Sequence, residues 1–494
     1  MEELNKFIEY NYKICDLEYI INLLNWELRI NANECLKEYI IKQITNTEEK
    51  LYKLKTATEY ETLINDCIKS NNFQKLPIEE QRYILNIKRR YDQNKKIPKD
   101  FYLKYIEICN VTNMVWETAK KENNYEKYKP YLNDMLKMTK QYYSYISNGK
   151  NLYDTMLEQY EINVTSETID RLFNKLKEFL IPFIKDNITK ESDKLEISYT
   201  EEELKSAAKY LLDYIGFDMN KGSLGIYPHG YTEKICNDDV RIAFRHTTDP
   251  IDFVTTIIHE GGHGIFEQNI NKELSKYTNE CVENLNALHE SQSRFYENIL
   301  GRNINFWIPI YDDIKKMLKL DLTLEEFYKR LNQIKPSLIR VEADEVTYCL
   351  HIIIRYEIER DLFLEKITID DLPTIWNNKM KEYLNVEVDS DSNGLMQDVH
   401  WSEGEFGYFP SYLLGTIYDG MFIEALEENF GSIDNLLKEG KIKEITKYLI
   451  NNIYCNGEAY CSEEVINRVC GKELSEKPII NYFVKKYKKT NDKK

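Results

Sequence analysis

The sequence predicts a mainly helical fold that contains one small β-sheet. Leucine and isoleucine recur at spacings of three and four residues along charged stretches, which is the periodicity of amphipathic helices. Only 11 prolines and 18 glycines occur among the 494 residues, so few positions interrupt a helix. One short region, residues 217–248, departs from this pattern and predicts the sheet.

Helical periodicity fills the first part of the chain. A long helical region is expected over residues 2–70, with breaks near Asn31 and Asn46. The first helices after it follow a proline or a turn, where helices commonly begin. The later helices are expected at 78–94, 100–123, 166–185 and 200–215. No internal repeat and no linker rich in proline and glycine divides the sequence.

Residues 217–248 contain the expected strands. Four helix-breaking residues interrupt helicity here: Gly222, Gly225, Pro228 and Gly230. Residues 241–245 then alternate polar and apolar side chains, as in a strand with one exposed face. A short strand or hairpin is therefore expected just before the next helix. Its edge can hold an extended peptide by main-chain hydrogen bonds, and the alternative is a purely structural hairpin.

Composition argues against several classes of partner and location. The net charge of −17 argues against a nucleic-acid-binding surface. No apolar run approaches the roughly 18 residues of a membrane helix, and the first residues show no secretory signal. The ten cysteines form no Cys-x-x-Cys pair, which is typical of reduced thiols in a cytosolic protein. We therefore expect a cytoplasmic protein without a nucleic-acid or membrane partner.

His259 and His263 belong to the most informative motif, His-Glu-x-x-His. Helix residues four apart lie one turn apart on the same face, so the two imidazoles can hold one zinc ion. Glu260 stands between them, where a carboxylate can activate a water molecule. The alternative is a histidine pair that caps or packs on a surface helix. Apolar neighbours such as Ile258 and Ile265 instead indicate a buried helix, in which this polar group needs a partner such as a metal.

Gly261 and Gly262 stand inside this motif. A glycine in a helix interior costs about 1 kcal/mol relative to alanine, so two in succession need an explanation. One explanation is the close approach of another backbone, such as an extended substrate. The other is packing against a neighbouring helix.

A catalytic zinc site uses three protein ligands and keeps one open position, so a third ligand is expected downstream. Glu290 lies 27 residues after His263, in a segment whose apolar residues recur at helical spacing. Glu283 and Glu297 are competitors that spacing alone does not exclude. Three polar neighbours can orient the site or be ordinary helix residues: Ser291, Gln292 and Arg294.

Two later segments supply further candidate residues. Arg340 can pair with Asp344 at i,i+4, or it can bind a ligand carboxylate through its planar fork. His400 can line a binding cleft or belong to a satisfied core pair. Tyr408 and Tyr412 can donate hydrogen bonds to a developing oxyanion, or they can simply pack.

The chain resembles the thermostable (Taq-type) metallocarboxypeptidases, peptidase family M32. The family's marks include His-Glu-x-x-His, His-Glu-Ser-x-Gln, Ile/Val-Arg-x-x-Ala-Asp and Gly-x-x-Gln-Asp-x-His-Trp. All four stand intact and in the family's order, at 259–263, 289–292, 339–344 and 394–401. Further similarities extend the resemblance over nearly the whole chain.

Two family marks are altered in this chain. The Asp-x-Arg-x-Thr motif occurs at residues 239–243, with Ala243 in place of threonine. The His-Pro-Phe motif has no clean counterpart, and Tyr227-Pro228-His229 is the nearest. Neither change falls on a candidate metal ligand.

The resemblance implies one domain, residues 1–494, of the gluzincin type found in oligopeptidases and angiotensin-converting enzymes. Such a fold is mainly α-helical, with a small β-sheet beside a long, deep active-site groove. It implies that the helical half, 1–200, covers the groove and that 201–494 carries the zinc site. Family members are usually cytosolic homodimers. They remove C-terminal residues with broad preference and accept a C-terminal proline poorly.

The expected function is that of a zinc-dependent carboxypeptidase of broad specificity. His259, His263 and Glu290 are expected to bind the metal, with Glu260 as the general base. Zinc is chosen on availability, since cobalt also suits two histidines and a glutamate. The alternatives are an oligopeptidase that cuts internally at the same metal site and a catalytically silent zinc-binding or peptide-binding protein.

The substrate is expected to be a peptide with a free C-terminus. Arg340 is the first candidate for binding its terminal carboxylate, and Arg241 is the second. Tyr408 or Tyr412 is expected to help stabilise the tetrahedral intermediate, and His400 is expected to line the substrate site.

Overall fold

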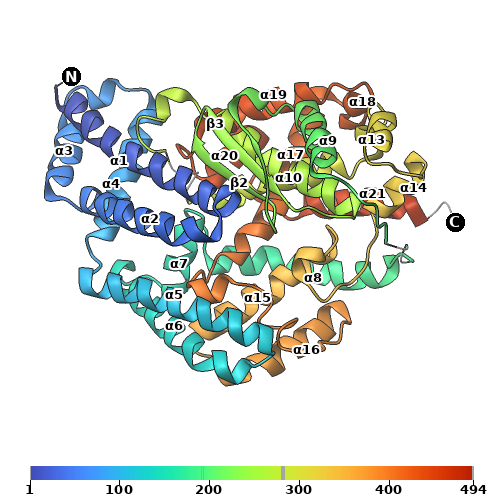
Figure 1. The fold of residues 1–494 in the computed structure, drawn as a ribbon, viewed down its shortest axis with the longest axis horizontal. Coiled ribbons are helices and arrows are strands. Elements are labelled where there is room, and N and C mark those ends of the chain that lie inside the picture. Colours follow the sequence, from blue (N-terminus) through green and yellow to red (C-terminus); the bar gives the residue numbers. More distant parts are fainter. Residues whose placement is uncertain (1, 191, 193, 280–283, 492–494) are drawn as a thin grey trace.

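The computed structural model describes residues 2–190, 192, 194–279 and 284–491. Helices make up most of this part of the chain, and they surround one three-stranded sheet (Figure 1). Apolar side chains from the whole length of the chain share one large buried core. These features confirm the mainly helical class with a small sheet.

The first nine helices precede the sheet. They agree closely with the ranges expected from periodicity at 78–94, 100–123, 166–185 and 200–215. The last of them begins at a capping box, in which Thr200 and Glu203 satisfy each other's backbone N–H groups. Their bounds are α1 (Glu2–Trp26), α2 (Glu34–Lys55), α3 (Thr58–Lys69), α4 (Ile78–Asn94), α5 (Lys99–Glu122), α6 (Tyr125–Ile146), α7 (Leu152–Tyr160), α8 (Ser166–Asn187) and α9 (Glu201–Ile215).

One of the two breaks expected in the N-terminal region is wrong. The chain does break after a π-helical turn, Glu27–Asn31, but helix α2 continues through Asn46. Ile44 and Thr47 are buried on one face of α2, so packing holds the helix together across this position. Tertiary packing here outweighs the weak helix propensity of asparagine.

The sheet lies between the N-terminal helices and the helix that follows it. Its strands are β1 (Leu224–Ile226), β2 (Tyr231–Cys236) and β3 (Asp239–Phe244), in the order β1-β3-β2. Strands β2 and β3 form an antiparallel hairpin, and β1 pairs with β3 in parallel. The expected exposed face is covered instead, because Trp26 of α1 packs against Ala243.

The remaining helices build the wall behind the sheet. Helix α10 packs against β3 and α9 on one side and against α11 on the other, and α17 packs against α11. Figure 1 shows α10 and α17 beside the sheet, with α5, α6 and α16 in the lower part of the view. The bounds are α10 (Pro250–Gln268), α11 (Asn286–Arg294), a π-helix (Phe295–Gly301), α12 (Ile304–Trp307), α13 (Tyr311–Met317), α14 (Leu324–Leu331), α15 (Thr347–Phe363), α16 (Leu372–Leu384), α17 (Phe409–Phe430), α18 (Ile433–Lys438), α19 (Ile442–Asn452), α20 (Ser462–Cys470) and α21 (Lys477–Asn491).

Two structural observations bear on the expectations from composition. The described cysteines are free thiols. In the part of the chain that the structure describes, no helix combines the length and the apolarity needed to cross a bilayer.

Candidate metal centre and active site

Helix α10 carries both histidines of the His-Glu-x-x-His motif. Asp249 caps the start of the helix, where its side chain accepts a hydrogen bond from the N–H of Ile251, and Pro250 is the first helical residue. From this start the helix presents His259 and His263 on one face, with ring centroids 5.0 Å apart. This is the spacing expected for two ligands of one metal ion.

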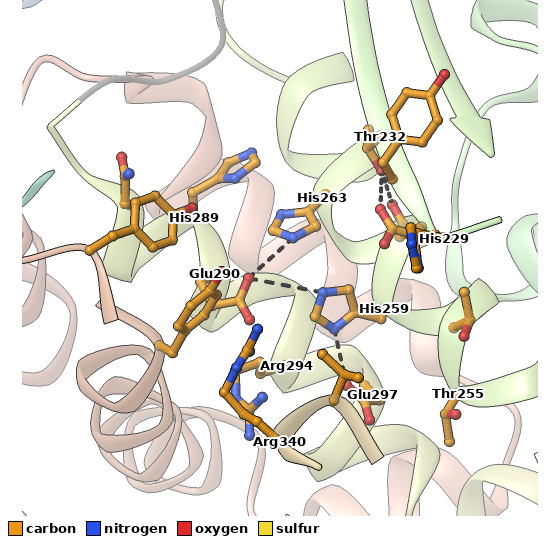
Figure 2. A pocket seen from close by; sticks show the side chains of 18 of the residues that line it. His229, Thr232, Thr255, His259, His263, His289, Glu290, Arg294, Glu297 and Arg340 are labelled. Carbon is orange, nitrogen blue, oxygen red and sulfur yellow. Dashed lines mark hydrogen bonds and ion pairs between the residues drawn. The ribbon is translucent and has the colours of Figure 1, made fainter. Parts of the chain in front are cut away.

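Glu290 on α11 completes a candidate metal site. Its Oε2 lies 3.3 Å from His263 Nε2 and 3.9 Å from His259 Nε2 (Figure 2). One possible ligand atom from each residue lies within 4.8 Å of the others. Two imidazoles and one carboxylate, which all line a cavity, are a donor set that suits a divalent ion with an open coordination position.

Glu283 and Glu297 were the other candidates for the third metal ligand. Glu283 lies outside the described residues. Glu297 faces the other ring nitrogen, since its Oε2 lies 3.0 Å from His259 Nδ1. Burial would raise the pKa of Glu297, but His259 and Arg302 lower it to about 2. Glu297 is therefore an ionised carboxylate that orients the His259 ring from behind.

His263 is oriented in a different way. Its Nδ1 is buried and has no hydrogen-bond partner among the described residues. Its ring stacks on that of His289, with centroids 4.5 Å apart and 23° between the ring planes. His289 Nε2 lies 3.1 Å from Glu267 Oε1, and Lys234 Nζ lies 3.0 Å from Glu267 Oε2. A buried polar chain thus supports the ring against which His263 packs.

Glu260 lies buried beside the metal site, under strand β2. Thr232 of that strand donates a hydrogen bond from its hydroxyl to Glu260 Oε2, at 2.8 Å. Burial raises the pKa of the Glu260 carboxyl, although His259 and the Thr232 hydrogen bond oppose this effect. The hairpin therefore fixes the carboxylate that the motif places next to the histidines.

Helix packing explains both glycines of the motif. A β-carbon added at Gly261 would lie 2.5 Å from a methyl group of Ile215 on α9. One added at Gly262 would lie 2.7 Å from Ser293 Cα and 2.8 Å from the carbonyl oxygen of Gln292, both on α11. The interpretation of the glycines as room for a substrate backbone is therefore wrong.

The metal-site residues line a cavity of about 1770 Å³. Helices α1 and α4 contribute Glu18 and Arg90 to its wall, while Arg340, Tyr408 and Tyr412 come from the second half of the chain. The cavity is therefore lined by side chains from both halves of the sequence. Arg241 and His400 are not among the residues that line it.

Arg340 reaches the cavity wall through a set of specific contacts. Its Nε donates to Asp398 Oδ1 at 2.9 Å, and its Nη1 donates to the Tyr348 hydroxyl at 3.0 Å. Asp344 does not pair with it and instead accepts hydrogen bonds from the N–H groups of Val346 and Thr347. The i,i+4 ion pair considered for Arg340 is therefore absent from the described structure.

Asp398 holds two arginines at once. Besides Arg340, it pairs with the fully buried Arg355, whose Nη2 lies 2.6 Å from Oδ2. Burial would raise the pKa of the Asp398 carboxyl, but the two guanidinium groups outweigh burial and hold the pKa well below its usual range. Asp398 is therefore ionised and anchors Arg340.

Arg241 and His400 lie away from the cavity. Arg241 pairs with Asp239 at 2.7 Å and packs over the ring of Trp26, so the end of α1 covers it. His400 is buried behind Tyr412, with 3.1 Å between its Nε2 and the tyrosine hydroxyl. Burial, followed by Arg340, lowers the pKa of His400 to about 3, so its imidazole is neutral.

Sequence reasoning gave too little weight to Arg294. It ends α11, four residues after Glu290, and its buried guanidinium lines the cavity. Its position one turn from a metal-site residue was the available signal. That spacing alone did not show that the side chain faces the cavity.

Comparisons with known proteins agree with this geometry. The family model described as carboxypeptidase Taq (M32) metallopeptidase matches residues 6–487. Carboxypeptidase 1 of Bacillus subtilis is 34% identical over 493 residues, which cover 98% of this chain and 97% of that protein. Thermostable carboxypeptidase 1 of Thermus thermophilus is 31% identical over 417 residues, or 81% of each chain. The crystal structure of M32 carboxypeptidase from Deinococcus radiodurans R1 superimposes with a TM-score of 0.94 at 25% identity, with 99% of each chain covered.

Proposed function

Because the chain belongs to the carboxypeptidase Taq (M32) family of metallopeptidases, we propose that it uses zinc to release C-terminal amino acids from peptides with broad specificity. It is a peptidase of this family that acts on peptide substrates with the help of a divalent metal. The observation that carries the finer proposal is the cluster of His259, His263 and Glu290 beside Glu260 in one cavity.

The proposed metal ligands are His259, His263 and Glu290. Cobalt also suits this donor set, so zinc rests on its availability. When bound, the ion polarises the scissile carbonyl and makes water a stronger nucleophile near neutral pH. Glu297 and His289 hold the two imidazole rings in the orientation that this binding needs.

Glu260 is the proposed general base. A carboxylate oxygen of Glu260 takes a proton from the attacking water and then passes it to the nitrogen of the leaving amine. The hydrogen bond from Thr232 helps to fix the orientation of the carboxylate where it lines the cavity. This restriction supports a role in proton transfer, which requires a fixed distance between donor and acceptor.

Arg340 is the proposed anchor of the terminal carboxylate. Asp398 and Tyr348 fix its guanidinium at the cavity wall, where a planar fork suits a carboxylate. Arg241, the second candidate, does not reach the cavity. Tyr408 and Tyr412 line the cavity and are the proposed hydrogen-bond donors to the tetrahedral intermediate, and His400 holds the Tyr412 hydroxyl.

The biological setting is proposed from composition and family. We propose a single domain, residues 1–494, in which the helices of 1–200 cover the cavity of the catalytic half, 201–494. Side chains from both halves line this cavity, which supports that division. Free thiols support a reducing cytoplasm, and the family supports a homodimer.

A peptide ladder tests the proposed activity against the internal-cutting alternative. A peptide of about ten residues is digested, and its products are identified by mass spectrometry at successive times, with and without a chelator. We expect a series of products shortened by one residue at a time from the C-terminus, which disappears with chelator and returns with zinc. Internal fragments from the first time point would instead establish an oligopeptidase. Cleavage that resists the chelator would contradict the metal site.

A further inference from the structure

Arg294 is a buried arginine that forms no direct ion pair within the described part of the chain. The residue is only 5% exposed, and its Nε donates to the Thr416 hydroxyl at 2.9 Å. Its guanidinium lies over the ring of Tyr348, 4.2 Å from the centroid. The terminal nitrogens keep access to the cavity that Arg294 lines. A buried arginine is rarely left without an anion, so this one points to a ligand.

Arg340 lies against the same aromatic ring. Its guanidinium carbon is 5.9 Å from the Tyr348 centroid, and Figure 2 shows Arg294 and Arg340 next to each other, below Glu290. Its Nε and Nη1 hold Asp398 and the Tyr348 hydroxyl, and Nη2 keeps access to the cavity. The guanidinium groups of Arg294 and Arg340 thus meet at the Tyr348 ring, and each can still donate N–H hydrogen bonds to a ligand in the cavity.

The charge balance of this wall favours an anionic ligand. Arg340 and Arg355 share a single carboxylate, Asp398. Arg294 adds a third guanidinium without a carboxylate of its own. Glu297 and Glu290 both interact with Arg294 through space, but Glu297 already contacts His259 and Arg302, and Glu290 is a proposed metal ligand. In the group formed by these three arginines and Asp398, positive charge exceeds negative charge, which favours an entering anion.

We propose that Arg294 and Arg340 together bind the C-terminal carboxylate of the peptide, one guanidinium on each side. The proposal rests on the proposed carboxypeptidase function. Arg294 follows Glu290 by four residues, so the two side chains leave the same face of α11 about 6 Å apart along its axis. Arg294 and Glu290 line the same cavity, so a carboxylate bound by Arg294 would direct the adjoining peptide bond, about one extended residue of roughly 3.5 Å away, toward the proposed metal ligands. Such an arrangement would favour the last peptide bond and would agree with the proposed release of single residues.

The test compares two probes that differ only in the terminal group, N-acetylphenylalanine and its amide. Inhibition constants of both are measured against the zinc-loaded enzyme. We expect Arg294→Met and Arg340→Met each to weaken inhibition by the acid at least tenfold and to leave that by the amide within about twofold. The double variant should lose less than the product of the two single effects, because both arginines contact one group.

Two further variants control for folding and for general charge. Arg294→Lys keeps the positive charge and should retain part of the preference for the acid. Arg245→Met removes a cavity arginine that already pairs with Asp252, at 2.7 Å, and should not change the ratio of the two inhibition constants. Metal content and melting temperature are measured for every variant.

Two results would overturn the proposal. Equal weakening of acid and amide by Arg294→Met, with metal retained, would assign Arg294 to structure. A loss of acid binding in Arg340→Met alone would leave Arg340 as the only anchor. In both cases the wild-type enzyme would still shorten peptides one residue at a time, so the proposed function would stand. Internal cleavage by the wild type would contradict the function itself.

Discussion

Gly262 on α10 lies directly against the backbone of Ser293 on α11. A β-carbon at Gly262 would stand 2.7 Å from Ser293 Cα, a distance that real side chains do not tolerate. The two helices carry different parts of the candidate metal site, with the histidines on α10 and Glu290 on α11. The close contact of their backbones therefore sets the distance between the metal-binding groups.

Gly262→Ala should weaken metal binding because it pushes α10 away from α11. We expect the metal dissociation constant, measured by competition with a chelator, to rise by at least tenfold. Gly261→Ala is the matched control, because its β-carbon meets the side-chain ends of Leu212 and Ile215, which can move. The control should lower the melting temperature but change metal affinity much less. Similar metal affinities in the two variants would contradict this account of Gly262.

Glu260→Gln should abolish most turnover and leave the metal bound. General base catalysis contributes roughly 10²-fold to 10⁴-fold to a rate, and we expect a loss of this size in kcat. The amide keeps the shape of the side chain, and its oxygen still accepts from Thr232, so the fold should not change. Kinetics and elemental analysis on the same samples check both parts. Near-normal activity with metal present would contradict the role of Glu260 as base.

Asp398→Asn should destabilise the protein in a pH-dependent manner. Breaking a buried ion pair costs about 3–5 kcal/mol when one partner loses its counter-charge, here Arg340 and Arg355. Because folding lowers the pKa of Asp398, its stabilisation is fully present above the unfolded pKa of about 3.9. It is lost as the pH falls from there toward the lower folded pKa.

The difference in unfolding free energy between wild type and Asp398→Asn should therefore be largest near pH 7 and shrink below about pH 4. Urea unfolding at pH 7, 5 and 3.5 measures it. A gap that stays constant over this range would show that Asp398 does not stabilise the fold through its charge.

The predictable part of the site is the part built within one helix. The spacing of His259 and His263 fixed their geometry, since four residues make about one helical turn. Glu290 was harder, because the choice between it and Glu297 depends on how α11 rotates against α10. Arg241 is covered by Trp26 of α1, whereas Arg294 contacts Thr416 of α17 and lines the cavity. These contacts depend on how the two helices pack. No periodicity in the sequence contains that information.

The same limit applies to the glycines and to helix α2. The reason for a glycine at position 262 became clear only from the position of α11. A glycine in a helix indicates that another group approaches closely, but the sequence does not show which group it is. Asn46 is a weak helix former in a helix that its buried neighbours hold together. The helical class was predictable because it depends on a periodicity that runs through most of the chain.

The buried chain of Lys234, Glu267 and His289 should set metal affinity through the His263 ring. Glu267 pairs with Lys234 and also lies 3.1 Å from His289 Nε2, so the two contacts must be separated. Two double variants achieve this. Lys234→Met with Glu267→Gln removes the ion pair but keeps an acceptor for His289, whereas Lys234→Met with Glu267→Leu removes both.

We expect the metal dissociation constant of the leucine variant to rise about 10-fold to 100-fold, the size of effect typical of groups that orient metal ligands. That of the glutamine variant should stay within a few-fold of wild type, because its amide oxygen still fixes the ring that stacks on His263. Both variants lack the ion pair, so its loss alone cannot produce a difference between them. Equal metal affinities in the two variants would mean that His263 holds its orientation without His289.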